Sequence, residues 1–260
     1  MRNLQSILEI NKVSKSYPAG PGAGQEQPVL KEVSLSVGEG EFVAVMGPSG
    51  SGKSTLLYAA SGMDQPTSGE VVFDGEKLTS MSEKKRDRLR QQKMGFVFQQ
   101  IHLLKNYCLM DNIILSPYLA GTESRDVIKR RAIDLMKRTG VAELADRDVT
   151  QASGGQLQRV GICRALINRP RIVFGDEPTG ALNSASSGEI MDLLGEINES
   201  GTTVLLVTHD VRVAARTERV LVMKDGRLAA EKQLGKCPKD KEVIRRREEE
   251  LTAWLLQMGV

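Results

Sequence analysis

The sequence predicts an α/β fold with a parallel-sheet core, an antiparallel β subdomain and an inserted helical subdomain. Short apolar runs that favour strands alternate with helix-favouring segments, which is typical of a parallel sheet with right-handed crossovers. In the first forty residues, apolar positions instead recur with period two. Residues 101–150 contain no convincing strand. The length of 260 residues fits one large domain or two small ones.

The antiparallel subdomain is predicted from two groups of segments. Near the N-terminus the apolar positions with strand spacing are Leu8, Ile10, Val13, Val33, Leu35 and Val37. Between them, residues 18–24 are rich in glycine and proline and predict a flexible loop. Residues 69–75 predict a further hairpin, because Asp74-Gly75 favours a tight turn. Together these strands would form a mostly antiparallel layer.

The parallel core is predicted from the remaining segments in order. Residues 42–46 form an uninterrupted apolar run, and a helix follows from Ser54 to about Gly62. Residues 82–92 favour a polar helix that faces solvent. Later in the chain, strands are predicted at 171–174 and 202–207, and helices at 187–198 and 211–216. No internal repeat is visible.

The inserted helical subdomain is predicted from an amphipathic segment. Within residues 126–136 the apolar side chains that fall roughly on one helical face are Val127, Ile128, Ile133, Leu135 and Met136. We expect the helical subdomain at about residues 100–165, inside a domain that covers residues 1–235. Residues 236–260 would then form a C-terminal helical extension, with Ile244, Leu251 and Leu255 on a common face.

Composition and charge argue against several functional classes. A net charge of +3 is too small to indicate a nucleic-acid partner. The basic run at 245–247 is followed at once by acidic residues 248–250, which predicts a solvated helix with i,i+4 ion pairs. Cys108, Cys163 and Cys237 form no C-x-x-C pair and indicate reduced thiols in a cytosolic protein.

Nothing in the sequence predicts a signal peptide or a membrane span. The N-terminus has polar residues in its first positions, and no stretch approaches the ~18 apolar residues that cross a bilayer. A role at a membrane would therefore need a separate partner chain. His102 and His209 have no partner at metal-ligand spacing, so a protein-held zinc site is not expected.

A phosphate-binding loop follows the buried run at 42–46. Its residues are Gly47, Pro48, Ser49, Gly50, Ser51, Gly52, Lys53 and Ser54, followed by Thr55, and they match G-x-x-x-x-G-K-[ST]. The glycines allow backbone N–H groups to close around phosphates, and the helix N-terminus adds positive potential. Lys53 would bind phosphate oxygens and Ser54 would bind Mg²⁺. The sequence therefore predicts a nucleoside-triphosphate site.

Two further motifs refine this prediction. Residues 173–175 are an apolar strand that ends in Asp176 and Glu177, the Walker B arrangement. Asp176 would hold Mg²⁺, and Glu177 would orient or deprotonate the attacking water. Upstream, a second helix is predicted to begin at Ser153, Gly154, Gly155 and Gln156. Ser153 would cap this helix, and the glycines would allow close approach of the backbone. One nucleotide does not need two such helix starts, so two chains are expected to meet head to tail and share them.

With these motifs in order, the sequence resembles the ATP-binding cassette (ABC) family over nearly the whole chain. The resemblance implies ATP and Mg²⁺ as cofactors and ATP hydrolysis as the activity. It also implies roles for three further residues: Tyr17 would stack on adenine, Gln99 would touch Mg²⁺ and water, and His209 would contact the γ-phosphate. Because both the loop at 47–55 and the signature at 153–156 are intact, the simplest assembly is a homodimer formed on ATP binding.

The sequence departs from the family pattern at two positions. Ala152 stands where the family usually has leucine before the signature, which alters the packing behind the glycines. Asn183 stands where many members have aspartate, which keeps a hydrogen-bonding group and removes a charge. The missing charge at Asn183 puts communication between the two sites of a dimer in question. Because Glu177 is present, we expect the chain to hydrolyse ATP and not merely to bind it.

Within the family, residues 176–184 and 152–160 resemble one branch. It comprises the ATPases of macrolide exporters, lipoprotein-releasing complexes and bacitracin-type antimicrobial-peptide resistance transporters, and residues 247–256 most resemble the last group. The resemblance implies a separate multi-spanning permease of the FtsX-like type and a peripheral place on the cytoplasmic face of a bacterial membrane. Ile101, Leu103 and Leu104 would then form the groove that receives the permease, or else pack in the core.

Other readings remain open at this point. The chain would alternatively serve lipoprotein release or another cell-envelope function within the same branch. A soluble ABC ATPase that acts on nucleic acid or ribosomes is disfavoured, because the chain has neither a second fused cassette nor long coiled coils or zinc modules. The C-terminal helix would brace the dimer, contact the permease or pack on its own domain.

Overall fold

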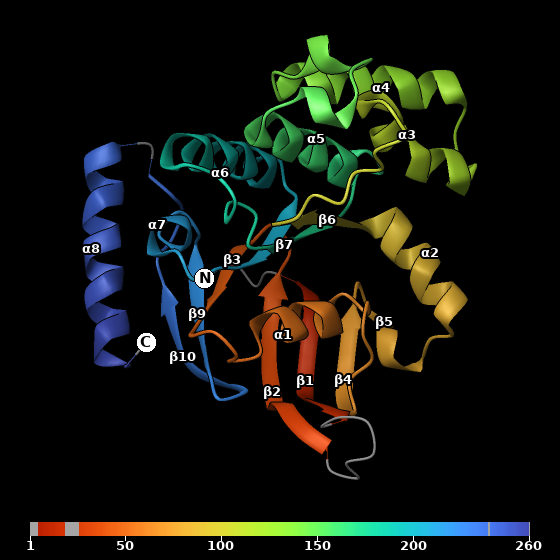
Figure 1. Cartoon of the computed structure of the whole chain (residues 1–260). Helices are drawn as coiled ribbons and strands as arrows, with labels where there is room; N and C mark the ends of the chain where they lie inside the picture. The colour runs from red at the N-terminus through yellow and green to blue at the C-terminus, as the bar shows by residue number, and fades with distance from the viewer. Residues whose placement is uncertain (1–4, 19–25, 239, 260) are drawn as a thin grey trace. The chain divides into compact units, whose positions relative to one another are not determined.

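The computed structural model describes residues 5–18, 26–238 and 240–259, which divide into two compact units. The first unit combines the described residues of Met1–Arg86 and Thr203–Val260, and the second is Asp87–Thr202. Figure 1 shows sheet and helices in both units. The predicted loop at 18–24 lies outside the described residues except for Pro18.

The first unit contains the strand that leads into the phosphate-binding loop. This strand, β3 (Phe42–Met46), pairs in parallel with β8 (Thr203–Val207) and with β9 (Arg219–Lys224), and β10 (Arg227–Gln233) adds an antiparallel edge. Every residue of β3 and β8 is buried, as their unbroken apolar sequences predict. Helices α1 (Lys53–Ala60) and α7 (Val211–Ala214) follow β3 and β8.

A four-stranded antiparallel sheet completes the β structure of the first unit. It contains β1 (Ser6–Pro18), β2 (Glu26–Gly38), β4 (Ser68–Phe73) and β5 (Glu76–Lys77) in the order β2-β1-β4-β5. A 3₁₀ turn at Leu78–Ser80 follows β5. The predicted alternation is confirmed, since Leu8, Ile10 and Val13 are buried and Val13 faces Val33 in the register.

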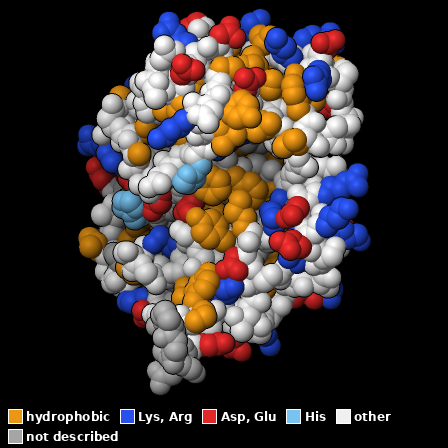
Figure 2. All heavy atoms as spheres, turned by 45° about the vertical axis from the view of Figure 1, so that its right-hand side comes forward, with side chains coloured by type: hydrophobic (Ala, Val, Ile, Leu, Met, Phe, Trp, Pro, Cys, Tyr) orange, Lys and Arg blue, Asp and Glu red, His pale blue; other side chains and the backbone are white. Residues whose placement is uncertain are grey.

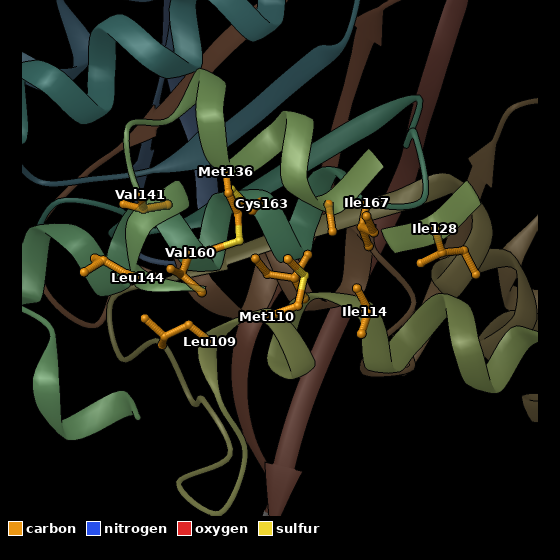
Figure 3. Close-up of a cluster of buried hydrophobic side chains, with 12 residues drawn as sticks. Leu109, Met110, Ile114, Ile128, Met136, Val141, Leu144, Val160, Cys163 and Ile167 are labelled. Atoms are coloured by element: carbon orange, nitrogen blue, oxygen red, sulfur yellow. The ribbon is translucent and has the colours of Figure 1, made fainter. Parts of the chain in front are cut away.

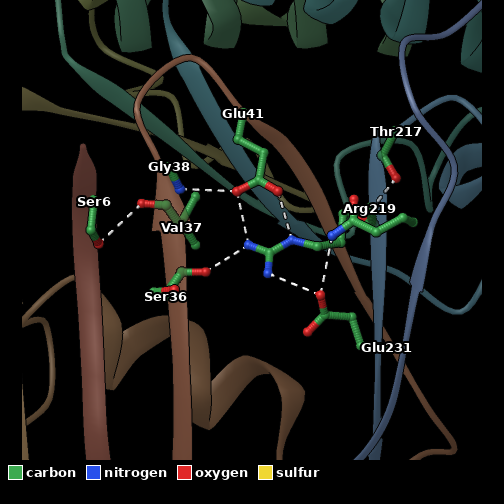
Figure 4. A network of polar contacts seen from close by, with 9 residues as sticks. Ser6, Ser36, Val37, Gly38, Glu41, Thr217, Arg219 and Glu231 are labelled. Atoms are coloured by element: carbon green, nitrogen blue, oxygen red, sulfur yellow. Dashed lines mark hydrogen bonds and ion pairs between the residues drawn. The ribbon is translucent and has the colours of Figure 1, made fainter. Parts of the chain in front are cut away.

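Within this unit a buried ion pair links the two sheets. The Arg219 Nε lies 2.6 Å from the Glu41 carboxylate, and its guanidinium also donates to the Ser36 carbonyl oxygen at 2.6 Å (Figure 4). Glu41 in turn accepts from the Gly38 backbone N–H. The ion pair with Glu41 and the hydrogen bonds from the guanidinium offset the loss of water contacts, so Arg219 is held although it is only 8% exposed.

The C-terminal helix α8 (Lys241–Gln257) packs on its own unit. Leu251 and Leu255 are buried, and the Lys232 ammonium lies 5.5 Å from the centre of the Trp254 ring. The predicted ion pair between Arg245 and Glu249 is present at 3.3 Å. Arg247, however, is buried, so this basic run is only partly a solvated face.

The second unit combines a parallel strand pair with helices. Its strands are β6 (Met94–Phe98) and β7 (Ile172–Asp176), and α2 (Glu83–Lys93) leads into β6. Its remaining helices are α3 (Leu109–Ala120), α4 (Arg125–Arg138), α5 (Gly154–Leu166) and α6 (Ser184–Glu199), with 3₁₀ turns at Ala142–Leu144 and Val149–Gln151. Helices α3, α4 and α5 pack against one another (Figure 1).

A hydrophobic cluster joins these three helices (Figure 3). It includes Ile113 from α3, Met136 from α4 and Cys163 from α5, all fully buried. The buried stripe of α4 runs through Ile128, Ala132 and Met136, whereas the predicted face included Val127, Ile133 and Leu135, which are only partly buried. Ala132 takes their place because the spacing i, i+4, i+8 follows the helical period. Burial raises the pKa of the Cys163 thiol to about 11, which keeps it protonated and unreactive.

Three strands were not predicted from the sequence. β9 has a buried apolar run, and Asp225-Gly226 closes its hairpin with β10, which is the turn signal that identified the earlier hairpin. β6 is shorter and contains a glycine, Gly95. A Cβ atom at Gly95 would lie 2.5 Å from the Ala165 carbonyl oxygen, so this glycine permits close packing of β6 on α5.

Candidate nucleotide site

The backbone of the phosphate-binding loop requires glycine at particular positions. Gly47 has φ +146°, and a Cβ atom there would lie 2.1 Å from the Met223 carbonyl oxygen on β9. Gly52 has φ +97° and stands immediately before α1, where an added Cβ would press on Leu30. No other residue satisfies both the backbone angle and the space. The loop therefore has the compact form that a phosphate cradle needs.

The predicted phosphate ligand Lys53 is the first residue of α1. Its ammonium group donates to the carbonyl oxygens of Gly47 and Pro48 at 2.8 and 2.9 Å, so the side chain lies back over the loop. Ser54 and Thr55 follow in the first turn of the helix. An ammonium group, a helix N-terminus and a hydroxyl thus share one end of α1, a donor set that suits a phosphate–Mg²⁺ group.

Tyr17, on β1, lies near the N-terminal end of α1. Its hydroxyl donates to Asp64 at 2.7 Å, and the Lys15 ammonium lies 4.9 Å from the centre of its ring. Burial and the neighbouring Asp64 raise the pKa of the Tyr17 hydroxyl, while the Thr55 hydroxyl lowers it. The structure therefore brings Tyr17 next to the last residue of the phosphate-binding loop.

Asp64 is the residue that holds Tyr17 in this position. Burial raises the pKa of the Asp64 carboxyl, but the hydrogen bonds from Lys15 and Tyr17 outweigh it, and the resulting pKa lies below the usual value. Lys15 donates to this carboxylate at 2.6 Å. Because Asp64 stays ionised near neutral pH, the Tyr17 ring keeps one orientation.

His209 follows β8, the strand directly beside β3. Val207 faces Val45 in the parallel register, and the Thr208 N–H donates to the Val45 carbonyl oxygen at 3.0 Å. His209 and the loop that starts at Gly47 therefore leave neighbouring strands at the same edge of the sheet. The His209 side chain is exposed, and Figure 2 shows histidine side chains (pale blue) at the surface.

The second unit brings together Gln99, Asp176 and Glu177. The Gln99 N–H donates to the Asp176 carbonyl oxygen at 2.8 Å, because β6 and β7 run in parallel and end side by side. A Cβ atom on Gly180 would lie 2.9 Å from the Gln99 amide nitrogen, so this side chain lies against the segment after Glu177. Glu177 has φ +47°, a left-handed conformation that a non-glycine residue adopts at some cost.

The signature residues form the start of α5. Ser153 is the N-cap, and its hydroxyl accepts from the Gln156 N–H while the Gln156 side chain accepts from the Ser153 N–H. This capping box fixes an exposed helix N-terminus, and backbone N–H groups there suit an anion. A Cβ atom on Gly155 would lie 3.3 Å from the Ser186 hydroxyl, so the glycine permits close approach of α6.

Both departures from the family pattern have local explanations. Ala152 is partly buried against the hydrophobic cluster of Figure 3, so its small side chain sets the packing behind the signature, as expected. Asn183 is the N-cap of α6, and its Oδ1 accepts from the Ser186 N–H at 2.9 Å. The hydrogen-bonding role predicted for Asn183 is therefore present, and it serves the helix.

Comparison with known proteins places these motifs in one family. Residues 30–180, more than half of the chain, match the family model described as ABC transporter. This chain belongs to the ABC transporter family. Two solved structures of MJ0796, a bacterial ABC transporter cassette, are 40% identical to it, with TM-scores of 0.80 and 0.81. Each match covers 87% of this chain and 98% of MJ0796.

One MJ0796 structure is a dimer in a post-hydrolysis state with ADP and Pi. A third structure, cbiO1 from Clostridium perfringens, is part of the ABC transporter complex cbiONQ. It is 29% identical with a TM-score of 0.78, and the match covers 98% of this chain and 97% of cbiO1. The chain is thus an ABC ATPase, an ATP-hydrolysing subunit of a transporter, with the α/β fold of the family.

The ABC fold also contains polar residues that the motifs did not identify. Asp64 and Lys15 position Tyr17, and Asp210 caps α7 directly after His209. Gln158, on α5, is buried with its side chain hydrogen-bonded to two backbone carbonyls. The sequence signal that could have identified Gln158 is a polar residue among the otherwise non-polar buried residues of α5. Among the described residues, no helix is long and apolar enough to cross a membrane.

Proposed function

We propose that this ABC ATPase works with a separate FtsX-like permease and couples ATP-driven closure of a homodimer to antimicrobial-peptide resistance or export. The observation that supports a docked partner best is the segment that follows Gln99. It carries exposed apolar side chains, Leu104 (46% exposed) and Tyr107 (45% exposed). Hydrophobic side chains of this kind interrupt the polar surface (Figure 2) and mark interaction sites when they form a patch.

This segment is held rigidly, which favours a docking role. The buried Asn112 side chain accepts from the Leu104 N–H at 2.7 Å. Its amide donates to the carbonyl oxygens of Leu104, Tyr107 and Cys108 at 3.0–3.3 Å. A single side chain thus fixes a loop that exposes apolar groups, so a partner would meet a surface that is already ordered.

In the proposed site, each residue group has one task. Lys53 binds phosphate oxygens, Ser54, Gln99 and Asp176 hold Mg²⁺, and Glu177 takes a proton from the attacking water. His209 orients the γ-phosphate and Tyr17 stacks on adenine. The signature of a second copy, Ser153–Gln156, supplies N–H groups to the same nucleotide, which is why the homodimer is part of the proposal.

The dimer and the membrane partner are also supported by relatives. Both MJ0796 structures are dimeric, and cbiO1 is part of a transporter complex. We place the subunit at the cytoplasmic face of a bacterial membrane, bound to its permease. The peptide-resistance assignment rests on the resemblance of residues 176–184 and 247–256 to that branch.

The test is a pull-down of tagged Glu177→Gln protein from detergent-solubilised native membranes with Mg-ATP, followed by mass spectrometry. We expect a multi-spanning permease with an extracellular domain. The matched control is the same protein with Leu104→Asp and Tyr107→Asp, which should still bind ATP and lose the permease. Recovery of a lipoprotein-release permease would reassign the substrate. Recovery of ribosomes or nucleic acid alone would overturn the transport proposal.

A further inference from the structure

We propose that Gln158 is the positioning residue that holds Gln99 and Glu177 in register, and that it ties both to the signature helix. This inference rests on the proposed roles of Gln99 and Glu177 and assigns a new residue to them. Gln158 lies on α5, two residues after the signature, and is only 2% exposed. A buried amide that touched nothing would cost stability, so its hydrogen bonds are informative.

The Gln158 amide nitrogen donates to two carbonyl oxygens from different segments. One belongs to Phe98, the residue before Gln99, at 3.2 Å. The other belongs to Pro178, the residue after Glu177, at 2.6 Å. One amide group therefore joins the end of β6 to the segment after β7. Since both carbonyl groups flank a proposed catalytic residue, a shift of Gln158 moves both residues together.

Glu177 needs such support because of its backbone conformation. With φ +47° it is held in a left-handed region that is unfavourable for a non-glycine residue. Such a conformation persists only where the surroundings fix it. The Pro178 carbonyl bond to Gln158 and the turn bond from the Gly180 N–H to the Glu177 carbonyl oxygen supply this restraint on the following segment.

Helix α5 holds the segment after Gln99 at two further points. A Cβ atom on Gly161 would lie 2.9 Å from the Ile101 Cγ2 atom, so helix and segment are in close contact. The Arg164 guanidinium donates to the Ile101 and His102 carbonyl oxygens at 2.6 and 3.0 Å. Gln158, Gly161 and Arg164 are three residues apart and form one row along the helix. The segment that carries the exposed apolar loop therefore moves with α5.

The decisive variant is Gln158→Met, which keeps the side-chain volume and removes both donors. We expect kcat for ATP hydrolysis to fall about tenfold or more, because small displacements of reacting groups are costly. The Kd for ATP should stay within about twofold, since the phosphate-binding loop lies on the other unit. Amide hydrogen exchange should accelerate at residues 98–102 and 177–180. These three readouts distinguish positioning from a general loss of structure.

The matched control is Arg159→Met, the next residue of the same helix. The Arg159 side chain donates to the Thr139 carbonyl oxygen and to the Glu189 carboxylate, and it forms no hydrogen bond with Phe98 or Pro178. It should lower kcat less than twofold. If Gln158→Met does not fold, Gln158→Asn replaces it. This variant keeps the amide but shortens the side chain by one methylene group, which withdraws the donor from the Phe98 and Pro178 carbonyl oxygens, and we expect a severalfold loss of kcat.

Three results would decide the question. A normal kcat in folded Gln158→Met or Gln158→Asn protein overturns the inference. Equal losses of kcat and ATP affinity also overturn it, because they indicate a purely structural role. Wild-type protein that binds ATP without hydrolysing it would instead remove the proposed roles of Glu177 and Gln99, which separates failure of the inference from failure of the proposed function.

Discussion

At the scale of single residues, side chains proposed for the site are held by neighbours that lie outside the motifs. Tyr17 is the clearest case, since Asp64 and Lys15 determine where its ring lies. The motif order predicted Tyr17 as a site residue, but it contained no information about Asp64. Contacts between residues about fifty positions apart depend on strand register, which the local sequence does not specify.

The Tyr17→Ala variant should weaken ATP binding, because base–aromatic stacking contributes about 1–3 kcal/mol. Tyr17→Phe is the control, since it keeps the ring and removes only the hydrogen bond to Asp64. Titration calorimetry with a non-hydrolysable ATP analogue measures both. Equal affinity in Tyr17→Ala and wild type would assign the adenine contact to another residue.

The Glu177→Gln variant should bind ATP normally and hydrolyse it about 10²–10⁴-fold more slowly, the usual range for loss of a positioned acid or base. The amide keeps the shape of the side chain and cannot accept the proton from water. Phosphate release at saturating ATP gives the rate, and calorimetry gives the affinity. An unchanged rate would show that another group activates the water.

At the scale of elements, the two departures from the family pattern affect a helix end and the packing of a helical cluster. Asn183 keeps α6 capped although the charge of an aspartate is missing. Ala152 packs into the cluster behind the signature. The sequence alone shows that both residues depart from the family pattern. Their structural roles could be assigned only once it was known which helix each residue contacts.

The Asn183→Ala variant should lower the free energy of unfolding by about 1 kcal/mol, because the first turn of α6 loses its side-chain cap. Asn183→Asp should unfold at nearly the wild-type denaturant midpoint, since aspartate caps equally well and suits the helix N-terminus. Urea unfolding followed by circular dichroism compares the two. Equal midpoints for all three proteins would show that this cap does not stabilise the fold.

Two arginines of α8, the buried Arg247 and the exposed Arg245, provide another test at this scale. The Arg247 guanidinium donates to the Gly235 carbonyl oxygen at 2.5 Å and to those of Leu234 and Ala215. Arg247→Met should therefore lower the free energy of unfolding by about 1.5–3 kcal/mol. Arg245→Ala, which removes only an exposed ion pair, should change it by less than about 0.5 kcal/mol. Similar unfolding midpoints would mean that Arg247 does not fasten α8.

At the scale of the whole chain, periodicity and turn signals predicted the elements that alternate or repeat clearly. The antiparallel strands, the buried strands β3 and β8 and the helices α4 and α6 are all confirmed. β6 was not predicted, because a short apolar run that contains a glycine does not distinguish a strand from a loop. The order of the motifs predicted the family, since each motif alone was weak and the sequence of motifs was specific.

The residues proposed for the site come from the sequence, whereas the contacts that hold them come from the structure. The sequence identified the residues of the phosphate loop, the Walker B pair and the signature. It did not predict that the Gln158 amide would donate to the carbonyl oxygens of Phe98 and Pro178, because those contacts require α5, β6 and β7 to be placed together. Buried polar contacts of this kind follow from packing of distant segments and have no local periodic signal.

In the proposed homodimer, two copies of the chain close on ATP, and the signature of each copy completes the nucleotide site of the other. The most direct measurement is analytical ultracentrifugation of Glu177→Gln protein with and without Mg-ATP. We expect a monomer of 28.5 kDa without nucleotide and a species of twice that mass with it. Adding Lys53→Ala should restore the monomer. A 28.5 kDa monomer that remains at saturating, demonstrably bound ATP would contradict the account.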